Sequence, residues 1–200
     1  RVWRCMVGRI PLYLLDTNLP ENSPADREIT SKLYGGGSEM RIKQEIVLGI
    51  GGVRAMEALN IKPSVWHMNE GHALPMCFYL LDKYKDLKEV QKRVVFTTHT
   101  PEKAGNEEHS IPLLHSMSFF NGLTPKQVDE YVHPENGMLN YTLTALRLSK
   151  KANGVSKLHA EVARKMWGDF KGICEIIAIT NAQNKTYWSD PELDKALKKN

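Results

Sequence analysis

Two stretches decide the fold: SVWHMNEGH at residues 64–72 and RVVFTTHTP at residues 93–101. Each begins as a short apolar run and ends in polar residues, as a buried strand entering a loop does. Further apolar runs occupy residues 10–15 and 176–180, and residues 152–155 form a brief strand or turn. Apolar spacing of three and four residues predicts helices over 39–59, 73–84, 139–148 and 156–167. This alternation indicates the α/β class, with a parallel sheet covered by helices on both faces.

The composition of the chain excludes several classes of protein. Its 200 residues suit a single domain or a large part of one, and no stretch approaches the roughly 18 apolar residues of a membrane span. The net charge of +4 is scattered, which argues against nucleic acid as a partner. Three widely spaced cysteines and no leader-like N-terminus indicate reduced thiols in the cytoplasm. The start without Met and the charged helical end suggest an excerpt from a longer protein.

Polar side chains follow the two deciding strands. Asn69, Glu70 and His72 come after the first, and His99 and Thr100 come after the second. In open parallel sheets, ligands bind outside the carboxyl ends of the strands. Neutral donors and acceptors with few full charges suit a polyhydroxylated ligand such as a sugar. Either histidine alone favours a structural role, but the pair at one rim favours a site.

Three other patterns have weaker interpretations. The five remaining histidines are expected to be structural or on the surface, and a zinc site from His67, Glu70 and His72 is disfavoured because the spacing is not His-Glu-x-x-His. Residues 49–52 lack the third glycine of a dinucleotide fingerprint, so close helix–sheet packing is the preferred account of these glycines. The glycine-rich turn at residues 34–37, which begins at Tyr34, suits an anion cradle or a flexible gate equally well.

Read in order, these segments resemble the α-glucan (glycogen/maltodextrin) phosphorylases, above all their shorter bacterial and archaeal branch. The resemblance rests on residues 7–18, 26–27, 33–36, 40–45, 49–54, 67–73, 96–101, 104–106, 153–161 and 179–181. It implies a Rossmann-like N-terminal half of a two-domain GT-B glycosyltransferase, in which residues 1–200 are part of a single domain on the glucan-binding side of the cleft. The implied reaction cleaves terminal α-1,4 bonds with phosphate and releases α-glucose 1-phosphate.

The resemblance also implies roles for individual residues. His99 would contact the reacting glucose and be the catalytic residue of this half. Asn69, Glu70, His72 and Thr100 would line the sugar pocket. Residues 34–37 would lie near the loop that gates the site. The substrate-binding set is completed by Asp190, which falls near the position of a glucose-binding asparagine.

The remaining implications concern regulation, the cofactor and partners. Arg41 falls in a region that binds effectors in animal members of this allosteric family, although a structural ion pair or a surface position suits it better. Pyridoxal 5′-phosphate and the phosphate clamp would belong to a second domain that this chain lacks, so the chain is expected to be inactive alone. α-1,4-Glucan and phosphate would be its partners, and the full-length enzyme would be a possible homodimer. The alternatives are a non-catalytic sugar-binding module and a sugar-nucleotide-dependent glucan synthase.

Overall fold

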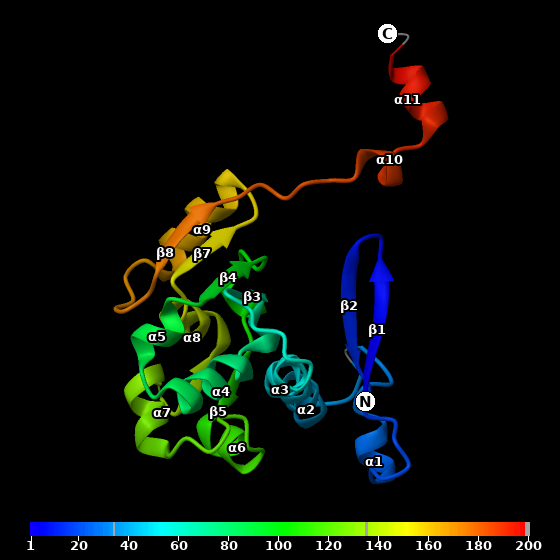
Figure 1. Cartoon of the computed structure of the whole chain (residues 1–200). Coiled ribbons are helices and arrows are strands. Elements are labelled where there is room, and N and C mark those ends of the chain that lie inside the picture. The colour runs from blue at the N-terminus through cyan, green and yellow to red at the C-terminus, as the bar shows by residue number, and fades with distance from the viewer. Residues whose placement is uncertain (34, 135, 199–200) are drawn as a thin grey trace.

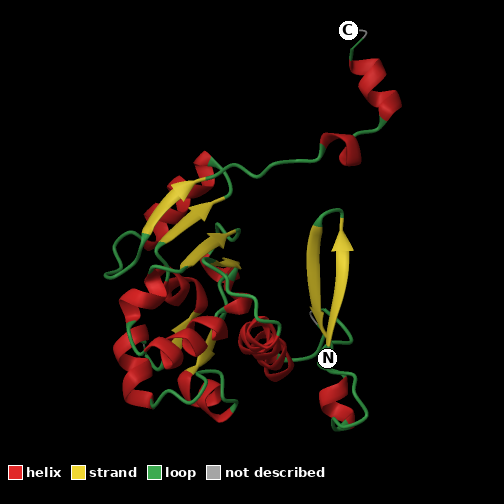
Figure 2. Cartoon of the chain, in the orientation of Figure 1, coloured by secondary structure: helices red, strands yellow, loops and turns green. Residues whose placement is uncertain are grey.

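A four-stranded parallel sheet lies at the centre of the computed structural model, which describes residues 1–33, 35–134 and 136–198. Its strands are β3 (Trp66–Asn69), β4 (Val94–Thr98), β7 (Lys151–Gly154) and β8 (Glu175–Ala178), in that spatial order (Figures 1 and 2). The α/β class with a parallel sheet is therefore confirmed.

One face of this sheet forms the core. Met68, Phe96, Ala152 and Ile176 are aligned across the four strands, and each is at most 4% exposed. The elements that pack on this face are α5 (Leu87–Gln91), α8 (Tyr141–Leu148) and α9 (Lys157–Trp167), and α4 (Pro75–Tyr84) contributes Phe78 and Leu81 to the same cluster. Within the described residues, the helical layer thus lies on one face of the sheet, so the expectation of helices on both faces is wrong there.

The opposite face carries polar residues. His67, Lys151 and Glu175 are exposed in one row across the strands. In the next row, Thr97 Oγ1 lies 2.7 Å from His67 Nε2 and donates to Asn153 Oδ1 at 2.7 Å. Successive side chains of a strand point to opposite faces, which produces these two different faces, although Val95 and Ile177 also lie on the polar one.

The other elements surround this unit. They are β1 (Val2–Val7), β2 (Ile10–Leu15), α1 (Pro24–Arg27), α2 (Ser38–Ile46), the π-helical turn η1 (Val47–Gly51), α3 (Gly52–Ala58), the 3₁₀ turns η2 (Gly71–Ala73) and η3 (Lys103–Gly105), β5 (Glu108–Ser110), α6 (Ile111–Ser116), α7 (Pro125–Val132), β6 (Met138–Asn140), α10 (Lys185–Trp188) and α11 (Pro191–Leu197). No described helix is both long and apolar enough to cross a membrane.

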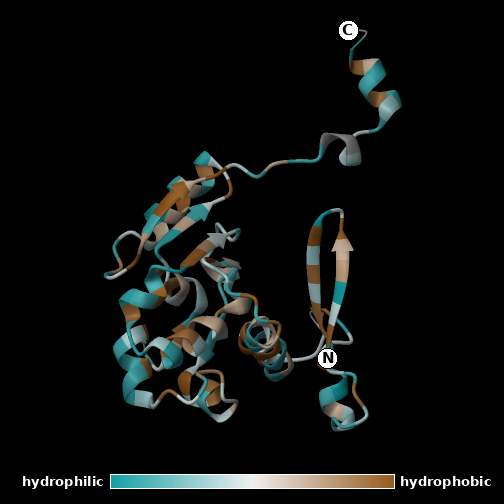
Figure 3. Ribbon diagram, in the orientation of Figure 1, coloured by the Kyte–Doolittle hydropathy of each residue, from teal (hydrophilic) through white to brown (hydrophobic). Residues whose placement is uncertain are grey.

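The predicted strand at residues 10–15 exists but lies outside the parallel sheet. It pairs antiparallel with β1, and the resulting hairpin stands beside α2 and α3 (Figure 1). Both of its strands are rich in apolar residues (Figure 3), yet Trp3 is 51% and Ile10 59% exposed. The hairpin therefore contributes little to the core of the described chain.

The predicted helix at 39–59 is observed as α2, η1 and α3 in succession, and its glycines pack differently from the expectation. A Cβ on Gly49 would lie 2.7 Å from Met76 N and 3.1 Å from Ala73 O. The close approach is thus to the segment that begins α4, and the expected helix–sheet contact is wrong for Gly49. The backbone at the start of α4 lies so close to residue 49 that only glycine, which has no side chain, fits there.

We predict that Gly49→Ala lowers the free energy of unfolding by about 1–3 kcal/mol, because its methyl group would overlap the backbone of Met76. Gly52→Ala is the matched control, since a Cβ there has no neighbour within 4 Å. It should raise stability by about 0.5–1 kcal/mol, the helix preference of alanine over glycine. Urea denaturation of both variants measures the difference, and equal midpoints would contradict the packing described here.

Candidate functional site

The carboxyl ends of β3 and β4 open onto a cavity of about 170 Å³. The residues that line it are Glu70, Gly71, His72, His99, Thr100, Gly105, Asn106, Glu107, Tyr141 and Thr142. They come from the loops after the two strands, from the η3–β5 connection and from the first turn of α8. A cavity at strand ends is where open α/β sheets bind ligands.

Glu70 joins the two strand ends. Its backbone N–H donates to Thr97 O at 2.9 Å, while its carboxylate accepts hydrogen bonds from the His99 N–H and, at 3.3 Å, from Thr100 Oγ1. Its φ of 63° and ψ of −177° lie in a region that is almost exclusive to glycine. Backbone strain of this kind persists only where the surroundings impose it, and it concentrates at functional sites.

The imidazole of His99 is oriented by Asn69. His99 Nε2 lies 2.6 Å from Asn69 Oδ1, and an amide oxygen can only accept a hydrogen bond. Nε2 is therefore the protonated nitrogen, and Nδ1 is left as an acceptor. The exposed His99 ring can thus accept a hydrogen bond from a ligand hydroxyl group.

The structure brings five of the six predicted site residues together. Glu70, His72, His99 and Thr100 line the cavity, and Asn69 holds His99. Asp190 is not with them, because the chain leaves β8 in an extended segment that carries α10 and α11 away from the sheet (Figure 1). Its carboxylate instead caps α11 by accepting from Glu192 N at 2.8 Å and Leu193 N at 3.0 Å.

The remaining early interpretations have mixed outcomes. His67 is held by Thr97 on the polar face of the sheet, and His159 Nδ1 accepts from Val155 N at 3.2 Å, so both have structural contacts. Tyr34 lies outside the described residues, which leaves the proposed anion cradle or gate at 34–37 without a description of its first residue.

A partly buried group of charged and polar side chains forms the back of the cavity, and we call it the Arg41 cluster: Arg41, Glu45, His72, Glu107 and Tyr141. Arg41 Nε lies 3.3 Å from Glu45 Oε1 and 3.6 Å from Glu107 Oε1. The Tyr141 hydroxyl donates to Glu45 Oε2 at 2.8 Å. Arg41 is thus in structural ion pairs, as its sequence position suggested.

The carboxyl groups of the cluster differ in acidity. Burial raises the pKa of Glu45 to about 8, and the nearby negative charge of Glu107 adds to this effect. Burial opposes ionisation of Glu107 as well, yet a hydrogen bond from His109 and the charge of Arg41 hold its pKa below the ordinary value. Burial, followed by the charge of Arg41, lowers the pKa of His72. At neutral pH the cluster therefore holds Glu45 protonated, Glu107 ionised and His72 neutral.

Sequence reasoning did not identify Glu45, Glu107 or Tyr141. The available signal for Glu45 was its position four residues after Arg41 on one helix, a spacing at which opposite charges can pair. Glu107 and Tyr141 reach the cluster only through the fold, so no local pattern could have indicated them.

The cavity wall suits neutral polar groups better than a phosphate-bearing cofactor. Among the described lining residues are the carboxyl groups of Glu70 and Glu107 but no lysine or arginine. Pyridoxal phosphate needs cationic or bare backbone partners, and this wall does not fit it. The arrangement can bind and orient hydroxyl groups.

Comparison with known proteins gives the family context of this geometry. Residues 1–174 match the family model described as the starch synthase catalytic domain. An uncharacterized protein of Methanocaldococcus jannaschii is 46% identical over 96% of the chain, and the maltodextrin phosphorylase of Thermococcus litoralis is 38% identical over 98%. The chain spans 36% and 25% of the lengths of these two relatives.

The solved structures include a similar fold. The catalytic domain of starch synthase IV from Arabidopsis thaliana, bound to ADP and acarbose, superposes with a TM-score of 0.67 over 95% of this chain and 39% of that one. The sequence identity is 16%, so this likeness shows the fold alone.

The Glu45 proton predicts how stability changes with pH. Between about pH 6.5 and 8 the folded chain holds a proton at Glu45 that the unfolded chain has released, so raising the pH destabilises the fold. His72 and His159 act in the opposite sense, but only below pH 6.5, because their pKa values are lowered from 6.5. We expect the free energy of unfolding of Glu45→Gln to rise relative to that of the parent by about 1 kcal/mol per pH unit across this window.

Urea denaturation at pH 6.5, 7.25 and 8 measures this difference. Glu57→Gln is the control, because a hydrogen bond from Lys83 lowers the pKa of this exposed carboxyl and its titration falls well below the window. A constant offset between Glu45→Gln and the parent at all three pH values would show that Glu45 is ionised throughout.

Proposed function

Because the chain belongs to the starch synthase catalytic domain family, we propose that it forms the glucan-binding half of the active site of an α-glucan glycosyltransferase. The chain is a glycosyltransferase domain of the GT-B type, with the Rossmann-like fold of the N-terminal half. The observation that carries the proposal is the cavity at the ends of β3 and β4, where His72 and His99 share one wall.

The chemistry of the wall supports a sugar as the ligand. Imidazole, hydroxyl and amide groups of His72, His99, Thr100, Asn106 and Thr142 line the cavity and supply both hydrogen-bond donors and acceptors. A volume of about 170 Å³ is below the roughly 300–1,000 Å³ of sites for drug-sized ligands, which suits a single sugar ring. In this proposal His99 contacts the reacting glucose through Nδ1, and Glu70 holds the loop that carries His99 in place.

The donor in the proposed reaction is a sugar nucleotide. This makes the complete protein a glucan synthase, the function in the description of the matching family. Transfer of the sugar from a nucleoside diphosphate sugar develops negative charge on the leaving diphosphate and positive charge on the sugar ring. Cationic groups must stabilise the charge on the diphosphate. The described cavity wall supplies none, so we propose that a second domain does.

A phosphorylase is the second candidate. The specific observation in its favour is the Thermococcus litoralis relative, named a maltodextrin phosphorylase, which aligns with 98% of the chain at 38% identity. In this reaction inorganic phosphate would take the place of the nucleotide, and pyridoxal phosphate would be held by the second domain. The sugar-binding half would have the same task in both reactions, which is why this chain alone does not discriminate between them. A sugar-binding module without catalysis would use the same cavity.

The donor can be identified in the complete protein that carries this chain. We expect ADP-glucose or UDP-glucose with glycogen to release nucleoside diphosphate and lengthen the glucan. Release of glucose 1-phosphate from glycogen and phosphate would instead establish the phosphorylase. Glucan binding without either product would leave only the sugar-binding module. The 200-residue chain alone should show neither turnover.

The role of His99 predicts a specific loss of activity. In the complete protein, His99→Gln should lower kcat/KM for glucan about 10- to 100-fold, the effect of one lost or misplaced hydrogen bond to the substrate. His67→Gln is the matched control, because that ring lies on the polar sheet face and contacts Thr97. It should change kcat/KM less than about twofold. Equal losses of kcat/KM in the two variants would show that His99 has no specific role in binding the glucan.

A further inference from the structure

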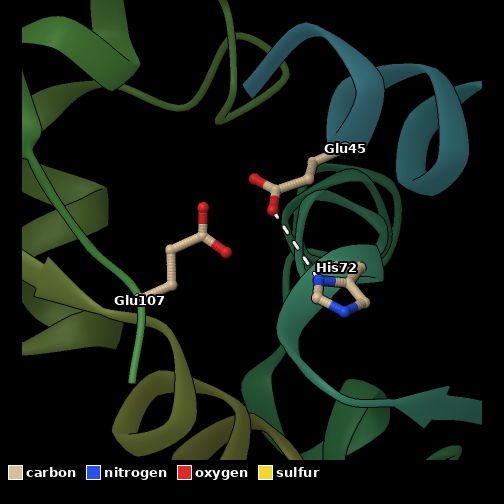
Figure 4. Close-up of side chains that lie close together, drawn as sticks. All are labelled: Glu45, His72 and Glu107. Atoms are coloured by element: carbon tan, nitrogen blue, oxygen red, sulfur yellow. Dashed lines mark ion pairs between the residues drawn. The ribbon is translucent and has the colours of Figure 1, made fainter. Parts of the chain in front are cut away.

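The guanidinium of Arg41 contacts three side chains at the back of the cavity. Besides Glu45 and Glu107, it reaches His72, whose Nδ1 lies 2.5 Å from Arg41 Nη2. Arginine only donates hydrogen bonds, so Nδ1 of His72 must accept. The ring of a neutral histidine then carries its proton on Nε2. Figure 4 shows that nitrogen on the side of the ring away from Glu45.

The surroundings of His72 come from four segments. Arg41 and Glu45 project from α2, and Glu45 Oε1 lies 3.9 Å from His72 Nδ1. Glu107 precedes β5 and is itself contacted by His109 Nε2 at 3.1 Å. Glu70 precedes η2, and its charge favours protonation of His72, as does that of Glu107. Tyr141 of α8 acts on the group through its hydrogen bond to Glu45.

The charge balance of the Arg41 cluster depends on whether Glu45 carries a proton. Arg41 supplies one positive charge, and two carboxylates around it would leave one negative charge in a buried place. Glu45 is 1% exposed, so an extra charge there is costly. Protonation of Glu45 leaves Arg41 and Glu107 as a balanced pair, and Arg41 can then keep its donor on His72.

A metal ion is the alternative occupant of this place. One ligand atom each from Glu45, His72 and Glu107 lie within 4.8 Å of one another. However, the Arg41 guanidinium already contacts these three side chains, at 3.3, 2.5 and 3.6 Å respectively. An internal cation therefore occupies the position that a metal would need, and the geometry favours the arginine.

We propose that Arg41, Glu45 and Glu107 form a positioning unit that keeps His72 neutral and directs its Nε2–H as a hydrogen-bond donor for the sugar. The proposal rests on the proposed function for its sugar ligand. Arg41, Glu45 and Glu107 are positioning residues here, because they act through His72.

Nuclear magnetic resonance of the labelled chain tests the unit without any sugar. We expect the His72 ring nitrogens to show the Nε2–H form and a titration midpoint below 6.5. Arg41→Met should raise that midpoint by at least one pH unit, a tenfold increase in proton affinity. Arg54→Met is the matched control, because Arg54 lies on α3 over the Tyr79 ring, and should leave His72 unchanged. An unmoved midpoint in Arg41→Met, or a proton on Nδ1 in the parent, would overturn the proposal.

A second variant covers the possibility that Arg41→Met does not fold. In the parent, ionisation of Glu45 should shift the His72 signals in a step near pH 8. Glu45→Gln keeps the shape of the side chain and should abolish this step. Persistence of the step in Glu45→Gln would show that Glu45 is not the group that ionises, and would contradict the proposal. Stoichiometric Zn²⁺ binding through His72 Nδ1 in the parent would also contradict it.

Glucan affinity separates this unit from the proposed function. In the complete protein, Arg41→Met should weaken maltoheptaose binding about tenfold, Arg54→Met should not, and Arg41→Met should add little in a His72→Ala background. If His72→Ala itself leaves affinity unchanged, the sugar role of His72 fails even where the ring titrates as expected. If His72→Ala weakens binding but Arg41→Met does not, the positioning unit fails and the sugar site stands.

Discussion

The contact of one guanidinium with three side chains connects α2 to the cavity. Arg41 and Glu45 belong to α2, His72 follows β3, and Glu107 precedes β5, so segments far apart in the sequence meet at this group. Buried ion pairs contribute little net stability, because desolvation offsets the attraction between the charges. The guanidinium instead sets the relative positions of these segments, because it contacts a side chain from each of them. The cavity wall depends on that arrangement.

Much of the fold could be predicted from local patterns. Apolar runs and helical spacing located three of the four sheet strands and the long helix at 39–59 to within a few residues, because burial enforces those periodicities. The other strand, β7, falls where the sequence indicated either a strand or a turn. The close approach of Gly49 to Met76 was missed, since it depends on packing across the fold. The hairpin partner of residues 10–15 was missed although it is the neighbouring segment of the chain. The cavity residues at strand ends were predictable from topology, whereas Glu107 and the distant position of Asp190 were not.

The two faces of the sheet divide the work of the domain. Met68, Phe96, Ala152 and Ile176 make one face a core, and this core fixes where β3 and β4 end. The loops that follow can then carry strained and polar residues such as Glu70 without unfolding. Stability and ligand chemistry are thereby supplied by different residues of the same strands, so the cavity lining can vary while the core is kept.

The π-helical turn η1 fixes the number of residues that the chain can have between α2 and α3. Such a turn holds one residue more than an α-helical turn, and each residue of a helix advances the side chains by about 100°. Deleting a single residue between Val47 and Gly51 would leave a straight helix whose two halves can no longer face their present neighbours together. Either Arg41 would turn from His72, or Gly49 would turn from the start of α4. Insertions and deletions in this segment are therefore coupled to the chemistry of a cavity that no residue of η1 lines.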